Sequence, residues 1–268
     1  MYENILTEVS RGVGIITLNR PERHNAFDDR MIGELTAATA AMEADSAVRV
    51  LVISSTGKSF CAGADVNWMR RAANITAQDS LNDARALAQM LRALAQMGKP
   101  TIARVQGPAC GGGVGLVAAC DVAIATYEAQ FTLSEVILGI VPAVIGPHLI
   151  AAIGERCARR YMLTAEPFAA AEAYRMGLLH EIVPDEASLD EAVGEIVDSL
   201  LANGPRALAA CKALIHAVAG RPLEAALIED TAQRSAAIRS TEEAQEGMAA
   251  YLQQRKPSWV PLDSEDPV

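Results

Sequence analysis

Several features are scarce or missing in this chain of 268 residues. Aromatic residues make up only 4% while hydrophobic residues reach 51%, so we expect an aliphatic core rich in alanine. Basic residues are outnumbered, with 23 Lys and Arg against 33 Asp and Glu and a formal charge of −10. Because nonspecific nucleic-acid binding needs a basic surface, we predict no nucleic-acid partner.

Cysteine is also sparse. The five cysteines are scattered, without a CxxC pair or a Cys/His cluster, so the sequence predicts neither a disulfide framework nor a metal site. No apolar run approaches the ~20 residues that cross a bilayer, and the start, MYENILTEVSRG, lacks the basic-then-apolar order of a signal peptide. We therefore expect reduced thiols in a cytoplasmic protein without a membrane partner.

What is present is an alternation of strand and helix patterns, which predicts an α/β fold. A polar loop is expected at residues 21–25, and from residue 147 on the pattern is mainly helical. The predicted strands are 5–9, 13–18, 48–53, 101–105, 122–125 and 180–183. The first two are expected to form a hairpin, and only the last one lies beyond residue 147. Predicted helices are 29–44 capped by Asp28, a short one at Trp68, 77–97 capped by Thr76, 114–119, 147–153, 155–163, 169–176, 185–202, 205–219, 222–239 and 241–255.

The chain is organised around the stretch VQGPACGGGVG, residues 105–115. Glycine lets a backbone approach a ligand closely, and the helix that follows offers unpaired N–H groups and the positive end of its dipole. Such a turn suits an anion or an oxygen that becomes negative during a reaction. A tight turn without a ligand is the alternative that this stretch alone leaves open.

A second turn of the same kind follows the strand predicted at 48–53. It reads SFCAGADVNWM, residues 59–69, and its small residues again permit close approach. We expect the two turns to aim two backbone N–H donors at one carbonyl oxygen. Asp65 is expected to cap the short helix, and Cys61 and Cys110 are interpreted as small buried hydrophobes because no base lies near them in the sequence.

Seven motifs in a fixed order resemble the enoyl-CoA hydratase/isomerase (crotonase) superfamily over nearly the whole chain. They are LNRPERHNAFD (18–28), SFCAGADV (59–66), KPTIARVQGPACGGG (99–113), CDVAIAT (120–126), FTLSEVILGIVP (131–142), AAEAYRMGLLHEIVP (170–184) and EGMAAYLQQRKPSW (246–259). The resemblance implies a spiral of ββα units with two roughly perpendicular sheets over residues 1–200. It also implies a C-terminal helical region, 201–268, that assembles the chain into homotrimers or dimers of trimers.

The resemblance also assigns catalytic roles. It implies that the backbone N–H groups of Ala64 and Gly112 hold a thioester carbonyl, with Glu135 as general acid/base. Relatives that add water to an enoyl-CoA commonly carry a second glutamate three residues after the middle glycine, and this sequence has Gly115 there. The two-glutamate mechanism therefore does not transfer unchanged. A solvated surface charge is the alternative interpretation of Glu135.

The substrate implied is an acyl-CoA thioester, so coenzyme A enters with the substrate and no separate cofactor is expected. Residues that match coenzyme A-contacting positions of the family are Arg23, His24, Ala26, Ala62, Ala64, Asp65, Val66 and Gly112. Arg255 or Lys256 is a further candidate for a phosphate contact, with ordinary solvated charge as the alternative.

Gly115 and the run GIVPAVIGP, residues 139–147, are most similar to a bacterial subgroup that hydrates branched, carboxylated enoyl-CoAs. Such substrates, of the 3-methylglutaconyl-CoA or carboxygeranoyl-CoA type, belong to leucine and acyclic-isoprenoid catabolism. Candidate partners of a distal carboxylate are Asn67, Arg70, Arg71 and His148. Three functions stay open at this point: a hydratase, a Δ3,Δ2-enoyl-CoA isomerase with one glutamate, and a non-catalytic acyl-CoA-binding protein.

Overall fold

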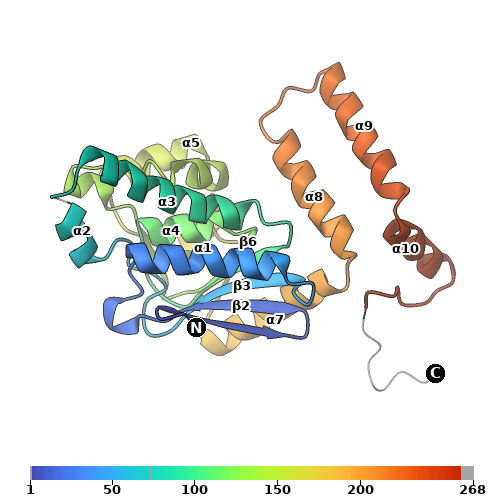
Figure 1. The fold of residues 1–268 in the computed structure, drawn as a ribbon, viewed down its shortest axis with the longest axis horizontal. Coiled ribbons are helices and arrows are strands. Elements are labelled where there is room, and N and C mark those ends of the chain that lie inside the picture. The colour runs from blue at the N-terminus through green and yellow to red at the C-terminus, as the bar shows by residue number, and fades with distance from the viewer. Residues whose placement is uncertain (1, 73, 261–268) are drawn as a thin grey trace. The chain divides into compact units, whose positions relative to one another are not determined.

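The computed structural model describes residues 2–72 and 74–260. The chain divides into two compact units, which we describe separately. The first comprises Met1–Met97 and Thr101–Glu195, and the second comprises Gly98–Pro100 and Ile196–Val268. Figure 1 shows the course of the chain through both units.

The larger sheet of the first unit has six strands within the described residues, in the order β1-β2-β3-β4-β6-β9. They are β1 (Ile5–Ser10), β2 (Val13–Leu18), β3 (Val50–Ser55), β4 (Thr101–Val105), β6 (Val122–Thr126) and β9 (Glu181–Val183). The hairpin of β1 and β2 is confirmed as antiparallel, and every later neighbour pairs in parallel. Strand β3 lies two residues beyond its predicted position.

A second, three-stranded sheet joins segments that the sequence patterns did not predict as strands. Its order is β5-β7-β8, with β5 (Ala109–Cys110) parallel to β7 (Gln130–Thr132) and β8 (Phe168–Ala169) antiparallel to β7. The expectation of a single strand beyond residue 147 is therefore wrong. Strands of two or three residues are too short for the period-2 alternation by which strands are recognised. The predicted α/β fold with two sheets is confirmed.

Helices of the first unit mostly agree with the predictions. They are α1 (Asp29–Ala44), α2 (Val66–Ala72), α3 (Ala77–Ala95), α4 (Gly112–Ala119), α5 (Gly146–Thr164), α6 (Ala170–Met176) and α7 (Glu186–Leu201), whose end belongs to the second unit, with short 3-10 helices η1 (Pro21–Arg23) and η2 (Glu135–Leu138). The Asp28 and Thr76 side chains cap α1 and α3 as predicted. The two helices predicted at 147–153 and 155–163 are confirmed as the two parts of α5, which is kinked at the non-helical residue Gly154. Helix α4 begins two residues earlier than predicted, and η1 lies in the predicted polar loop.

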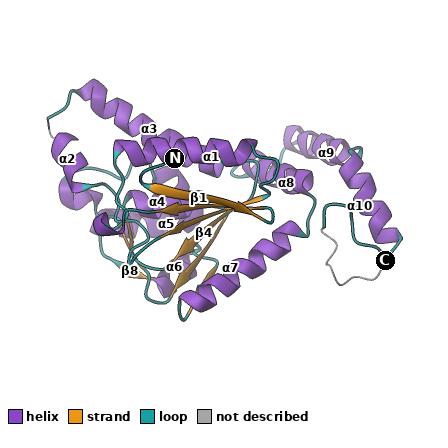
Figure 2. Ribbon diagram, turned by 60° about the horizontal axis from the view of Figure 1, so that its bottom comes forward, coloured by secondary structure: helices purple, strands orange, loops and turns teal. Residues whose placement is uncertain are grey.

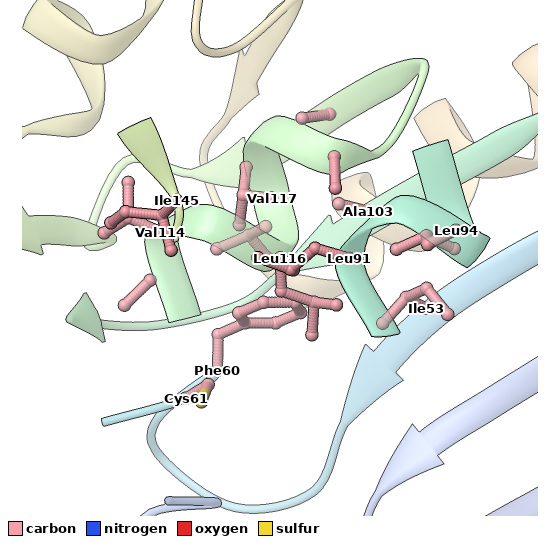
Figure 3. Close-up of a cluster of buried hydrophobic side chains, with 14 of the residues drawn as sticks. Ile53, Phe60, Cys61, Leu91, Leu94, Ala103, Val114, Leu116, Val117 and Ile145 are labelled. Atoms are coloured by element: carbon pink, nitrogen blue, oxygen red, sulfur yellow. The ribbon is translucent and has the colours of Figure 1, made fainter. Parts of the chain in front are cut away.

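Helices cover both faces of the larger sheet. Side chains alternate along β4, so Ala103 faces α3, where it lies near Leu91 and Leu94 in the aliphatic core (Figure 3), while Arg104 faces the other side. There Arg104 donates to Asp190 of α7 at 2.6 Å. Figure 2 shows α1 and α3 side by side on one face of the sheet and α7 on the opposite face.

The second unit contains the end of α7 with α8 (Pro205–Val218), α9 (Ala225–Arg239) and α10 (Glu242–Leu252). The Glu243 carboxylate of α10 accepts from the N–H groups of Arg206 and Ala207 and so caps the start of α8. Helix α9 starts three residues later than predicted and α10 ends three residues earlier. None of the helices in the described parts of the chain is both long and apolar enough to cross a membrane.

Candidate active site

Two turns at the ends of β3 and β4 run side by side. We call residues 61–65 the alanine turn and residues 107–113 the glycine turn. Cys110 N–H donates to Cys61 O at 2.8 Å, which joins the two turns. On its other side the alanine turn pairs with Phe27, whose N–H donates to Gly63 O at 2.6 Å and whose carbonyl accepts from Asp65 N–H at 2.8 Å. The alanine turn is therefore fixed between two backbone segments.

Close backbone contact explains the small residues of both turns. Gly63 has φ +81°, and a Cβ on it would lie 2.8 Å from Cys110 O. A Cβ on Gly113 would lie 2.4 Å from Cys61 O. Because a Cβ does not fit at these distances, glycine is required at both positions.

The two turns present backbone N–H groups that are not used by the fold. Gly112 is the first residue of α4, so its N–H has no acceptor within the helix. Within residues 2–72 and 74–260, neither the Ala64 N–H nor the Gly112 N–H has a hydrogen-bond acceptor. Unpaired donors at a helix start suit a developing negative charge on an oxygen. That these two groups hold a carbonyl stays a prediction.

Glu135 lies directly against the glycine turn. It follows β7 as the first residue of η2, and the Gly111 N–H bonds to the end of β7 through Thr132 O at 2.9 Å. The place that a Cβ on Gly111 would take is 3.0 Å from Glu135 Oε1 and 3.5 Å from its Cδ. The carboxylate is therefore held beside the residue that precedes the Gly112 donor.

The Glu135 carboxyl is only partly solvated. Its Oε2 atom is buried and accepts no hydrogen bond from any part of the chain that the structure describes. Burial raises the pKa of this carboxyl above its ordinary value, and the hydrogen bond from its own backbone N–H opposes the shift only in part. A raised pKa brings the group toward the range in which it both accepts and returns protons near neutral pH. The interpretation of Glu135 as a solvated surface charge is not supported by this environment.

The position of Gly115 is closed by another side chain. A Cβ on Gly115 would lie 2.2 Å from Ile145 Cγ2 and 3.5 Å from Leu91 Cδ1. Ile145 is only 2% exposed, and Figure 3 shows it packed beside Val114 at the start of α4. In the sequence, both Gly115 and the run 139–147 differ from the pattern common in the family, but no local pattern indicates that the two are in contact. The space over Gly115 therefore holds neither a second carboxylate nor a free volume.

The predicted coenzyme A contacts lie in and beside the alanine turn. Arg23, His24, Ala62 and Val66 are exposed, whereas Ala26 is buried. The Ala62 N–H donates to His24 O at 2.9 Å, so the loop after β2 and the alanine turn form one surface. Their contact with coenzyme A stays a prediction.

Asp65 caps the short helix α2 as expected. Its Oδ1 accepts from Asn67 N–H at 2.7 Å, and its Oδ2 lies 3.3 Å from Arg20 Nη2. Burial by itself would raise the pKa of the Asp65 carboxyl, but the hydrogen bonds from Asn67 and Trp68 together with the charge of Arg20 lower it. The Asp65 carboxylate is therefore occupied within the protein.

The candidates for a distal substrate carboxylate differ in availability. Arg71 donates to Asp29 at 2.8 Å, so its charge is already paired. Arg70 donates to Asn67 Oδ1 at 3.0 Å and lies on exposed α2. Burial lowers the pKa of the His148 imidazole, which favours its neutral form.

Two further predicted groups have definite surroundings. Arg255 binds both oxygens of Glu246, at 2.6 and 2.7 Å, and this pairing lowers the pKa of Glu246 to about 2. Burial raises the pKa of the Cys61 thiol to about 12 and also raises that of Cys110. Both thiols are therefore held protonated. Cys61 is buried as expected, whereas Cys110 is only partly buried.

The chain is similar to known proteins over nearly its whole length. The family model described as enoyl-CoA hydratase/isomerase matches residues 8–261. A putative enoyl-CoA hydratase of Thermus thermophilus is 34% identical over 94% of this chain and 99% of its own length. The 2,3-dehydroadipyl-CoA hydratase of Escherichia coli is 33% identical over 97% of this chain and 99% of its own length.

A solved structure is similar over almost the same extent. The crystal structure of an enoyl-CoA hydratase from Shewanella pealeana has a TM-score of 0.93 and 40% identity, covering 96% of each chain. The family-model match, over residues 8–261, includes both turns, Glu135 and the helices of the second unit. The chain therefore belongs to the enoyl-CoA hydratase/isomerase family.

Proposed function

We propose that this protein is an enoyl-CoA hydratase, which adds water across the 2,3 double bond of an enoyl-CoA thioester. The observation that carries the proposal is the buried, unpaired Oε2 of Glu135 beside the glycine turn, together with the Ala64 and Gly112 N–H groups of the two joined turns, which have no acceptor in the described chain. A carboxylate next to two free donors is what proton transfer beside a thioester carbonyl requires.

In the proposed reaction the thioester oxygen accepts hydrogen bonds from the Ala64 and Gly112 N–H groups. Glu135 removes a proton from water, and the water oxygen bonds to C3 while the π electrons move onto the thioester oxygen. The enolate then takes the proton from Glu135 at C2, which regenerates the carboxylate. Loss of one such donor typically costs ~3 kcal/mol of transition-state stabilisation.

Glu135 carries both proton transfers in this scheme. The packing of Ile145 against Gly115 supports a site with one carboxylate, because an acidic side chain does not fit there. One carboxylate is sufficient, since the proton taken from water is the proton delivered to C2. The same arrangement favours a second candidate, a Δ3,Δ2-enoyl-CoA isomerase, in which Glu135 moves a proton between C2 and C4 without water.

We further propose that the acyl group is branched or carboxylated, as in 3-methylglutaconyl-CoA. A relative that acts on a carboxylated enoyl-CoA by its name, the 2,3-dehydroadipyl-CoA hydratase, supports a carboxylated substrate. Arg70 remains available to such a group more readily than Arg71, which is paired with Asp29.

We also propose assembly as a homotrimer or a dimer of trimers. Large apolar side chains that the second unit leaves exposed support it, among them Leu223, Tyr251 and Leu252, at 82%, 84% and 80% exposure.

The test is a product assay with crotonyl-CoA, 3-methylglutaconyl-CoA and a 3-enoyl-CoA, read by mass for the wild type and for Glu135→Gln. The proposal expects a product heavier by one water that disappears in the variant, and the best substrate decides the acyl group. Double-bond migration without added water would favour the isomerase. Tight binding of all three thioesters without turnover would favour a non-catalytic protein. Light scattering during gel filtration decides the assembly.

A further inference from the structure

Arg20 lies at the centre of a polar network that the proposed reaction does not use. It follows β2, and its side chain is 14% exposed. Its Nη1 donates to Ala26 O at 2.8 Å and lies 3.0 Å from Asp28 Oδ2, while its Nη2 lies 3.3 Å from Asp65 Oδ2. One guanidinium therefore binds three acceptors on two separate segments of the chain.

Each of the two carboxylates also starts a helix with its other oxygen. Asp28 Oδ1 accepts from Met31 N–H in the first turn of α1, and Asp65 Oδ1 accepts from Asn67 N–H in the first turn of α2. Because Arg20 holds the remaining oxygen of each, it links the starts of both helices. A planar fork of donors makes this possible, which a single ammonium group does not reproduce.

The residues adjacent in sequence to the two carboxylates contact each other, and one of them, Ala64, belongs to the proposed site. Phe27, next to Asp28, forms a parallel bridge with Ala64, next to Asp65. Ala64 is one of the two residues whose N–H has no acceptor within the described chain. A displacement of either carboxylate would therefore move the residue that carries the donor.

Arg20 also shapes the loop that precedes Phe27. Its backbone N–H donates to Asn25 Oδ1 at 2.8 Å, and its carbonyl accepts from Asn25 N–H at 2.9 Å. Asn25 is fully buried, has φ +55° and donates its amide to Thr56 O and Ser59 O. The loop thus closed contains Arg23 and His24, which are predicted to contact coenzyme A. The bonds to Asn25 belong to the Arg20 backbone and persist in any Arg20 variant, whereas the side chain holds the loop through its bond to Ala26 O.

We propose that Arg20 is a positioning residue that holds the Ala64 N–H donor and the coenzyme A-contacting loop as one rigid unit. The proposal rests on the proposed function of this site. Since a displacement of about 1 Å at a reacting centre can cost about 100-fold in rate, loss of Arg20 should affect both kcat and KM.

The chain offers a matched control in Arg104. Its side chain is 15% exposed and binds two carboxylates, Asp190 at 2.6 Å and Glu186 at 3.5 Å, on the face of the sheet that α7 covers. Arg104→Met therefore also removes an arginine with two carboxylate partners, but Glu186 and Asp190 are 67% and 66% exposed whereas Asp28 and Asp65 are 22% and 6% exposed. We expect the larger loss of thermal stability in Arg20→Met, because exposed ion pairs contribute little and a buried carboxylate left unpaired is costly. At a temperature where both variants are folded, we expect a loss of kcat/KM of at least tenfold, shared between lower kcat and higher KM, only in Arg20→Met. Arg20→Lys should recover part of the loss, because an ammonium reaches one carboxylate at a time.

A second readout does not depend on turnover. Hexa-2,4-dienoyl-CoA absorbs at longer wavelength when hydrogen-bond donors polarise its carbonyl. Bound to proteins that carry Glu135→Gln, it should show a red shift that survives Arg104→Met and shrinks with Arg20→Met or Arg20→Lys. If the wild type hydrates no thioester, the proposed function fails, while this shift still tests Arg20.

Three results would overturn the inference. Wild-type kcat and KM in an Arg20→Met protein that is folded but less stable than the wild type would show a purely structural role. An unchanged red shift in both Arg20 variants would do the same. Absence of any red shift with Arg20 intact would show that there is no donor for Arg20 to position.

Discussion

Two glycines one helical turn apart, Gly111 and Gly115, meet opposite kinds of side chain. The Cβ position of Gly111 faces the carboxylate of Glu135, and that of Gly115 faces the methyl groups of Ile145. The first contact places a titratable group with one buried, unpaired oxygen beside the free donors. The second closes the other side of α4 with apolar packing. The same residue type thus admits a carboxylate at one position and close apolar packing at the other.

Substitution of Glu135, which lies against Gly111, should have the largest effect, and this effect is on kcat. Glu135→Gln keeps the shape of the side chain but removes its capacity to take a proton, so kcat should fall by about 100- to 10,000-fold. Glu135→Asp withdraws the carboxylate by one methylene, so its kcat should lie between that of the wild type and that of Glu135→Gln. Steady-state kinetics on the best substrate provide the measurement. Exposed Glu128, on the turn before β7, supplies the control, because Glu128→Gln should leave kcat unchanged. A comparable loss of kcat in Glu135→Gln and Glu128→Gln would show that Glu135 has no specific catalytic role.

The Gly115 side should respond through stability instead. Gly115→Ala places a methyl group 2.2 Å from Ile145 Cγ2 and should destabilise the fold by about 1–3 kcal/mol. Ile145→Ala leaves a cavity in the core and should cost about 2–5 kcal/mol. The double variant should cost clearly less than the sum, because the added methyl group partly fills the cavity. Urea unfolding of the four proteins measures this cycle. Additive costs would mean that the two residues do not share one space.

A smaller effect concerns the pH dependence of stability. Burial raises the pKa of Glu135 in the folded state above its unfolded value, so between these two values the folded state binds more protons. The contribution of Glu135 to stability therefore falls as pH rises through this window, and above it the charged carboxylate is a net cost. Glu135→Gln should be more stable than the wild type at neutral pH, and the difference should vanish below the unfolded pKa. Unfolding free energies at several pH values check the sign. A variant that is less stable than the wild type at neutral pH would contradict the burial argument.

The sequence was informative where function depends on local chemistry. Local sequence patterns predicted three kinds of feature: small residues at a close backbone approach, helix caps such as Asp28 and Asp65, and an acidic residue in an apolar run. The three short strands β5, β7 and β8 were not predicted, since two or three residues carry no periodicity. The contact of Ile145 with Gly115 and the three acceptors of Arg20 join residues between 6 and 45 positions apart. Such contacts come from tertiary packing, which no local pattern specifies.

We propose that Glu135 alone moves the protons of the reaction, because Ile145 fills the space over Gly115. The pH dependence of kcat/KM tests it most directly, because it reports the ionisations that the free enzyme requires. We expect one acid limb with a slope of one in the plot of log kcat/KM against pH. Its midpoint should lie above the ordinary glutamate pKa of ~4.3, and no second ionisation should lower the rate up to about pH 8. A bell-shaped profile whose descending limb persists with a substrate lacking ionisable acyl groups would show a second proton-transferring group and contradict the account.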